Sequence, residues 1–120
     1  MSGDHYPKFR AASVQASSVF LDRDATIDKV ESLVKKAAQN GADIVVFPES
    51  FIPAFPVWNM LYAPMDQHHY YQKLFNHSIT IPSPQFKQLS HIAKTNHIYL
   101  SIGISEKSDI SMGAMWNTNL

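Results

Sequence analysis

The 120-residue sequence contains no cysteine. This absence excludes disulfide bonds, thiolate metal sites and a cysteine nucleophile within these residues. An excess of one charge is also lacking, because ten lysine and arginine residues balance ten aspartate and glutamate residues. Without a basic stripe to neutralise phosphate groups, we expect no nucleic-acid partner.

Long hydrophobic runs are missing as well. No apolar stretch approaches the roughly 20 residues that a membrane-spanning helix needs, so we expect no membrane partner. The N-terminal segment 1–10 is polar and lacks the apolar region of a signal peptide, and we therefore expect a cytoplasmic protein. The length suits one small domain with a single hydrophobic core.

The first half of the chain has the pattern of a βαβ unit. Residues 9–16 are predicted to form a strand of mostly small side chains that is packed closely on both faces. Hydrophobic residues then recur at helical spacing over about residues 24–40, with Asp24 as the N-cap and Gly41 as the C-terminal stop. Residues 43–47 follow as a fully buried second strand. The crossover between the two strands should be right-handed.

The second half of the chain is predicted to hold two more helices and two more strands. The proline-rich stretch 49–65 should form a fixed irregular loop, and long loops in compact domains usually have a function. Helices should begin at Asp66 and span residues 83–96, and strands should cover residues 97–105 and 115–120. Because the last strand has no closing turn, we expect the domain to continue beyond it. The 120 residues alone should be only marginally folded.

Glu49 is the leading candidate for chemistry. It follows the buried strand directly after Pro48, which ends the strand because it has no N–H for the ladder. Ligands bind outside the carboxyl ends of strands in open α/β sheets. A dry apolar pocket there would disfavour the charged carboxylate, which suits a general base. From position alone, a catalytic Glu49 and a Glu49 that caps the loop by accepting backbone N–H bonds are equally favoured.

Aromatic residues of the proline-rich loop suggest a hydrophobic substrate pocket. We expect Phe55, Trp58 and Met60 to bind substrate, and Tyr70 and Tyr71 of the following helix to pack in the core. Ordinary core or subunit packing is the alternative for the whole group.

Two features near the C-terminus bear on the same region. Asn117 and Thr118 could supply hydrogen bonds behind the site, although satisfaction of both by a strand ladder is at least as well supported. Gly103, in the predicted third strand, leaves room for something packed closely against the sheet.

Other chemistries find little support in the sequence. His68 and His69 are adjacent and would point about 100° apart on a helix, and no H-E-x-x-H pattern occurs, so we expect no metal site. Ser50 lies in no G-x-S-x-G elbow. No glycine-rich phosphate loop is present, and we expect no cofactor.

Five short stretches, in the same order along the chain, match those of a known family. They are Ala12-Ser-Val-Gln-Ala16, Asn40-Gly-Ala-Asp43, Val45-Val-Phe-Pro-Glu-Ser-Phe-Ile-Pro53, Leu100-Ser-Ile-Gly103 and Trp116-Asn-Thr118. Together they resemble the N-terminal part of the nitrilases, which belong to the carbon–nitrogen hydrolase superfamily. The motif Phe-Pro-Glu followed by Phe-Ile-Pro-x-x-Pro-x-Trp favours the nitrilase branch over the amidase and carbamoylase branches.

The resemblance implies an α/β fold, an αββα sandwich of two stacked sheets. Residues 1–120 would be the N-terminal portion of a single carbon–nitrogen hydrolase domain, with about four strands and three helices. It also implies hydrolysis of a nitrile to a carboxylic acid and ammonia through a Glu-Lys-Cys triad, without a cofactor. Glu49 stands at the glutamate position as the catalytic general base, whereas the lysine and the cysteine would lie beyond Leu120. The family commonly forms homo-oligomers, and we expect the same of the full-length protein.

Three interpretations of the chain remain open at this point. The first is part of a nitrilase that is inactive without its other residues, because a glutamate alone provides no nucleophile. The second is a non-catalytic remnant that pairs with full-length subunits, and the third is an amidase of the same superfamily. The sequence does not distinguish aliphatic nitriles, arylaliphatic nitriles and amides as substrates.

Overall fold

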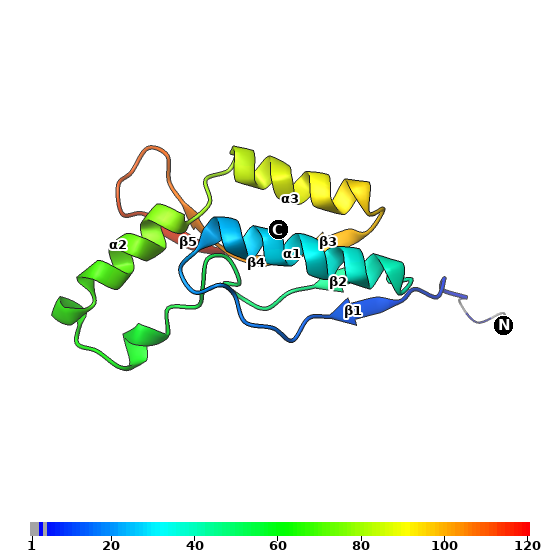
Figure 1. Cartoon of the computed structure of the whole chain (residues 1–120), viewed down its shortest axis with the longest axis horizontal. Coiled ribbons are helices and arrows are strands. Elements are labelled where there is room, and N and C mark those ends of the chain that lie inside the picture. The colour runs from blue at the N-terminus through cyan, green and yellow to red at the C-terminus, as the bar shows by residue number, and fades with distance from the viewer. Residues whose placement is uncertain (1–2, 4) are drawn as a thin grey trace.

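The residues that the structure describes, residue 3 and residues 5–120 of a computed structural model, form three α-helices, two 3₁₀ turns and five strands. In chain order these are β1 (Ala11–Ser13), α1 (Arg23–Gln39), β2 (Ile44–Val46), η1 (Val57–Met60), η2 (Pro64–Asp66), α2 (His68–His77), α3 (Pro84–Thr95), β3 (Tyr99–Ser101), β4 (Gly103–Lys107) and β5 (Met115–Asn119). Strands β1, β2 and β3 make a parallel sheet in that order, and β4 pairs with β5 in an antiparallel hairpin (Figure 1). The predicted α/β architecture is confirmed.

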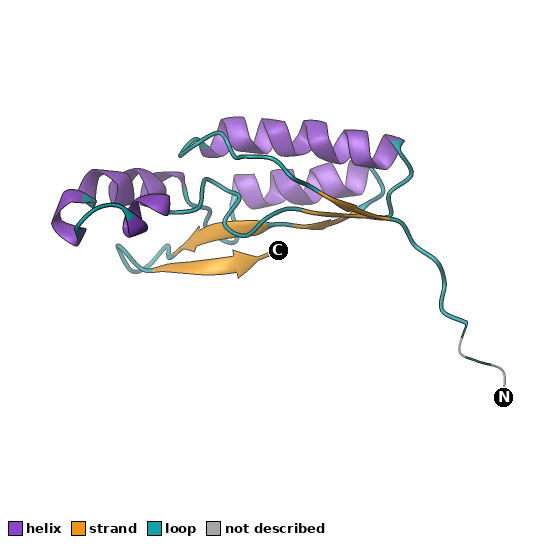
Figure 2. Cartoon of the chain, turned by 90° about the horizontal axis from the view of Figure 1, so that it is seen from below, coloured by secondary structure: helices purple, strands orange, loops and turns teal. Residues whose placement is uncertain are grey.

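Helices α1 and α3 cover one face of the parallel sheet (Figure 2). On that face Val45 of β2 is buried and packs in one cluster with apolar residues of both helices, namely Ile27, Val30, Val34, Leu89 and Ile92. On the other face Val46 is 39% exposed, and its register partner Ser13 in β1 is also exposed. The predictions of a fully buried second strand and of close packing on both faces of the first are therefore wrong. Both helices lie on the same side, and in an αββα sandwich the open face would meet a second sheet.

The strand predicted over residues 97–105 is divided at Ile102. Its first part, β3, pairs with β2, whereas its second part, β4, pairs with β5. Ile102 exchanges two backbone hydrogen bonds with Leu120, at 3.1 and 2.9 Å. The two partners lie on opposite edges: residues 101, 103 and 105 bond to the β2 side, where Ile52 still bridges Ile104 beyond Pro48, and Ile102 bonds to the β5 side.

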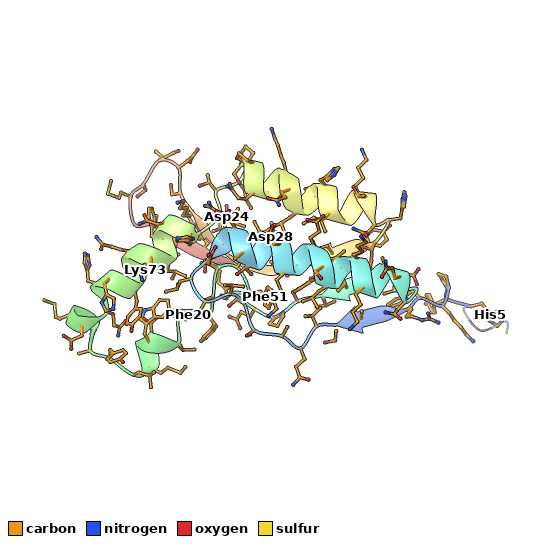
Figure 3. All side chains as sticks on the ribbon, viewed as in Figure 1. His5, Phe20, Asp24, Asp28, Phe51 and Lys73 are labelled. Carbon is orange, nitrogen blue, oxygen red and sulfur yellow. The ribbon has the colours of Figure 1, made fainter. Side chains whose placement is uncertain are left out.

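Helix α1 begins one residue after Asp22, which is its N-cap. Asp22 has an extended backbone (φ −123°, ψ 99°), and its carboxylate accepts from the backbone N–H of Ala25 at 3.0 Å. The prediction that Asp24 is the N-cap is wrong, because Asp24 already lies in the first helical turn. Asp24 instead forms an ion pair with Arg23 at 2.9 Å, and Figure 3 shows it with Asp28 near the N-terminal end of the helix.

Replacement of the two aspartates should separate these roles. We expect Asp22→Ala to lower the free energy of unfolding by about 1 kcal/mol, since it leaves a backbone N–H without its partner. Asp24→Asn should cost less than about 0.5 kcal/mol, because the Asp24 side chain is 66% exposed and its ion pair is screened by solvent. Urea unfolding followed by circular dichroism measures both, and a larger loss for Asp24→Asn would contradict the assignment.

The small contribution of Asp24 should also depend on pH. The hydrogen bond from Arg23 is the main cause that holds the pKa of Asp24 below its ordinary value. A lowered folded-state pKa means that the carboxylate stabilises the fold above the unfolded-state pKa, and that this stabilisation disappears as the pH falls through the folded-state pKa. The difference between wild type and Asp24→Asn should therefore vanish in strong acid, and its persistence there would contradict this origin.

The predicted start of α3 is confirmed, whereas the predicted start of α2 is wrong. Ser83 is the N-cap of α3, where its side chain accepts from the backbone N–H of Phe86 at 3.2 Å, as predicted. Asp66, in contrast, closes the 3₁₀ turn η2, and the N-cap position of α2 is Gln67, whose side chain makes no capping bond. Within the described part of the chain, no helix has the length and apolar character needed to span a bilayer.

Candidate functional site

Glu49 lies at the carboxyl end of β2, in a short segment that leaves the strand ladder. Before the segment, the backbone N–H of Phe47 donates to Ser101 O at 2.8 Å, and after it the N–H of Phe51 donates to Gly103 O at 2.8 Å. Between these two anchors the backbone turns, and Ser50 takes a left-handed conformation (φ 47°) that is uncommon for a residue other than glycine. The segment is therefore held at both ends against β3 and β4.

Residues 48–50, which include Glu49, pack with their backbone directly against Gly103. A Cβ atom added at Gly103 would lie 2.6 Å from the backbone nitrogen of Ser50, 2.7 Å from the Cα atom of Glu49 and 2.7 Å from the carbonyl oxygen of Pro48. Real Cβ atoms do not approach other atoms so closely. The expectation that Gly103 admits a close neighbour is confirmed, and the neighbour is the backbone that presents Glu49.

Asn117 of β5 holds the carboxylate of Glu49. Its side-chain Nδ2 donates to Oε1 of Glu49 at 2.6 Å, which is a short, charge-assisted hydrogen bond. The adjacent Thr118 points to the opposite side of the strand, where its hydroxyl donates to Oε2 of Glu106 at 2.7 Å. Of the two residues singled out in the sequence, Asn117 alone therefore reaches Glu49. This bond also shows that Glu49 accepts from a side chain, in contrast to the loop-capping alternative.

A hollow of about 250 Å³ adjoins Glu49 and is walled mainly by apolar side chains. Glu49 is the one charged side chain among the described residues that line it, and the others are Ser50, Phe55, Pro56, Trp58, Asn59, Tyr71, Leu74, Ser105, Met115, Trp116 and Asn117. Glu49 also borders a second hollow of about 250 Å³, which Phe20, Phe51 and Val57 help to line. Glu49 is nevertheless exposed, so the expected dry pocket is not formed by these residues. The walls surround the carboxylate only in part and leave it open to solvent.

The three predicted substrate-binding residues are placed differently. Phe55 is 45% exposed and lines both hollows, and Trp58 is 2% exposed and lines the first. The Trp58 ring is stacked on Tyr70 with centroids 5.3 Å apart. Met60 is 72% exposed and lines neither hollow. Met60 lies two residues after the buried Trp58 in η1. Because a 3₁₀ turn has about three residues per turn, the side chains of these two residues point in different directions.

Tyr71 was predicted to pack in the core, but it lines the hollow instead. It is 40% exposed, and its hydroxyl donates to the carbonyl oxygen of Gly113 at 2.6 Å, which ties α2 to the loop between β4 and β5. Its neighbour Tyr70 is half-buried against Trp58. Adjacent residues on an α-helix point about 100° apart, so only one of the two can face the core. Tyr71 and Trp116 were missed as lining residues because no local pattern distinguishes a pocket wall from a surface.

Metal ligands do not gather near this hollow. Across the described residues, no three histidine, cysteine, aspartate or glutamate side chains come close enough together to hold a metal ion.

Comparison with known proteins decides the family. The sequence model described as carbon–nitrogen hydrolase matches residues 10–120, which is nearly the whole chain. The chain belongs to the carbon–nitrogen hydrolase family.

Curated relatives of this carbon–nitrogen hydrolase chain include several nitrilases. It is 45% identical over 116 residues to a nitrilase of Bacillus sp. (strain OxB-1), covering 97% of the chain and 33% of that protein. It is 38% identical over 108 residues to an aliphatic nitrilase of Rhodococcus rhodochrous, covering 87% and 27%. An arylacetonitrilase of Aspergillus oryzae is 39% identical over 97 residues, covering 81% and 28%. The chain thus spans about a third of the length of these relatives.

Solved structures similar to this carbon–nitrogen hydrolase chain include amidases. An amidase from Nesterenkonia sp. matches with a TM-score of 0.54 and 19% identity over 81% of this chain and 32% of that one. A double mutant of the amidase from Nesterenkonia sp. AN1, solved in complex with acrylamide, matches with a TM-score of 0.51 and 17% identity over 85% and 35%. At these identities the likeness shows the fold alone, which is that of the nitrilase-superfamily amidases.

Proposed function

We propose that the protein is a nitrilase, which hydrolyses a nitrile to a carboxylic acid and ammonia, and that residues 1–120 are part of its single catalytic domain. The observation that carries the proposal is the placement of Glu49 at the carboxyl end of β2, where Asn117 holds its carboxylate beside an apolar hollow. The nitrilase names of relatives with 45, 38 and 39% identity support the choice of reaction.

In the proposed mechanism Glu49 is the general base. Its carboxylate takes the proton of a cysteine thiol, and the thiolate attacks the nitrile carbon to form a thioimidate. Water addition then releases ammonia and leaves an acyl-enzyme, and a second water, activated by the same carboxylate, releases the acid. The 120 residues contain no cysteine, so the nucleophile would come from other residues. No lysine is among the described residues that line the hollow, and the family resemblance places the lysine of the triad beyond Leu120 as well. Without them we expect no turnover, because water would have to attack an unactivated carbon.

The walls of the hollow favour a nitrile with an apolar substituent. Phe55 and Trp58, on the substrate side of Glu49, would contact that substituent. Glu49 is the one charge in the described lining, so a substrate carboxylate would find no cation there, and an ammonium group would find no anion other than Glu49 itself. Met60 has no place in the proposed contact set, since it lines neither hollow.

The most direct test of the proposal is the gene itself. Sequencing downstream of the Leu120 codon should reveal a lysine and then a cysteine in the same reading frame. The encoded protein should then convert a simple aliphatic or arylaliphatic nitrile to its acid, with ammonia release measured by a coupled assay.

Two results would contradict the nitrilase proposal, and a third would contradict the need for residues beyond Leu120. Turnover of the amide without turnover of the nitrile would instead make the protein an amidase. A stop codon directly after Leu120, with a stable product, would favour a non-catalytic remnant that pairs with full-length subunits. Nitrile turnover by residues 1–120 alone would contradict the need for further residues. Cytoplasmic location and homo-oligomer formation stay predictions.

A further inference from the structure

The side chains of Ser50, Asn117 and Glu49 form a hydrogen-bonded chain that ends at the carboxylate of Glu49. Nδ2 of Asn117 donates to Oε1 of Glu49 at 2.6 Å, and the hydroxyl of Ser50 donates to Oδ1 of Asn117 at a longer 3.4 Å. The two polar atoms of the Asn117 amide therefore have different partners. Its Nδ2 faces Glu49, and its Oδ1 faces Ser50. Rotation of this amide by 180° would break the bond to Glu49 and place oxygen against the carboxylate, whereas the Ser50 hydroxyl could accept from the turned NH₂ group.

The two partners of Asn117 belong to the segment that presents the carboxylate, whereas Asn117 comes from a distant strand. Ser50 is 5% exposed and has the left-handed backbone that turns the segment over Gly103. Asn117 is fixed by the β4–β5 ladder, where it is paired with Ser105. The side chain that reaches Glu49 is thus held by a regular strand, 68 residues away in sequence.

We propose that Asn117 is a positioning residue for Glu49. By donating to Oε1 it fixes the direction of the carboxylate and leaves Oε2 free to accept a proton. An asparagine suits this task, because its amide donates to a carboxylate without adding a charge of its own. An aspartate at the same position would bring a second carboxylate within hydrogen-bond distance, and two carboxylates so close resist being charged together.

Asn119 provides a matched control on the same strand. It lies two residues further along β5, so that its side chain leaves the strand on the same side as that of Asn117. Its Oδ1 accepts from the hydroxyl of Ser101 at 3.2 Å, much as Oδ1 of Asn117 accepts from Ser50. Asn119→Asp therefore adds the same charge to the same strand, about 7 Å along it from Asn117.

The contact can be tested without any enzyme activity. In ¹⁵N-labelled encoded protein, the side-chain NH₂ signals of Asn117 should move in Glu49→Ala, because the hydrogen bond to the carboxylate is lost. They should keep their positions in Asn119→Ala. Signals of Asn117 that are unchanged in Glu49→Ala, or that move as far in Asn119→Ala, would overturn the proposal.

The positioning role rests on the proposed function and is tested by kinetics. For nitrile turnover by the encoded protein, Asn117→Asp should lower kcat about 100-fold and move the acid limb of the pH–rate profile upward by about one pH unit. Asn119→Asp should change kcat less than about threefold and leave the acid limb in place. Equal effects of the two substitutions would contradict a specific role of Asn117. Absence of turnover in the wild type would contradict the proposed function, while the NMR comparison of the variants still decides the contact.

Discussion

Glu49→Gln should lower kcat for nitrile hydrolysis by about 10³-fold and leave the fold of the encoded protein unchanged. Glutamine has the shape of glutamate, and its Oε1 can still accept the 2.6 Å hydrogen bond from Asn117. What it lacks is the ability to take a proton from a thiol or from water. Loss of kcat with an unchanged thermal midpoint would therefore isolate the chemical role of the carboxylate from any structural one.

The control for this substitution is Glu31→Gln. Glu31 is an exposed carboxylate of α1, and it lines neither hollow beside Glu49. We expect its replacement to change kcat less than about twofold, since isolated surface charges contribute little. Steady-state kinetics on both variants gives the comparison. A kcat for Glu49→Gln within about threefold of wild type would remove Glu49 from the proposed mechanism.

Gly103→Ala is the substitution with the largest expected effect on stability. The added Cβ would lie 2.6 to 2.7 Å from three backbone atoms of residues 48–50, and backbone atoms in a hydrogen-bonded segment cannot move aside as a flexible side chain can. Either the segment shifts and loses its bonds to Gly103 O, or the strand moves. We expect the free energy of unfolding to fall by about 3 kcal/mol, at the upper end of the usual cost of overpacking.

The same displacement should reach the proposed active site. A shift of the Glu49 segment moves the carboxylate away from Asn117, so kcat should fall about 100-fold even in the fraction that remains folded. Gly3→Ala is the matched control, because a Cβ at Gly3 meets nothing within 4 Å. Urea unfolding and single-turnover kinetics measure the two effects. A loss of stability below about 0.5 kcal/mol in Gly103→Ala would contradict the close packing.

Several elements could be predicted because the residues that decide them are neighbours in the chain. The stripe of α1 and the serine–proline start of α3 are set by side chains three or four positions apart, and both helices form as predicted. Pro48 ends β2 through the missing N–H of its own backbone, which places Glu49 at the carboxyl end of a strand. Gly103 indicated a close contact, because glycine is the one residue without a Cβ atom and so lets another backbone approach the strand.

The errors have a common cause, which is competition between local signals of similar strength. Asp22 and Asp24 are equally suitable N-caps as residue types, and the backbone conformation of Asp22 decided between them. Tyr70 and Tyr71 are equally aromatic, and the direction from which Trp58 approaches α2 decided which of them is half-buried. The exposure of Val46 depends on what covers the second face of the sheet, and no property of Val46 reports that.

The sequence alone was sufficient to single out Glu49 as a carboxylate that directly follows a strand, since short-range patterns specify where strands end. Only the tertiary structure could pair Glu49 with Asn117, place its backbone over Gly103 and set Phe55 rather than Met60 beside it. These contacts join residues up to 68 positions apart. Their existence depends on strand register and on which face the helices cover, and these are properties of the packed molecule that no short stretch of sequence encodes.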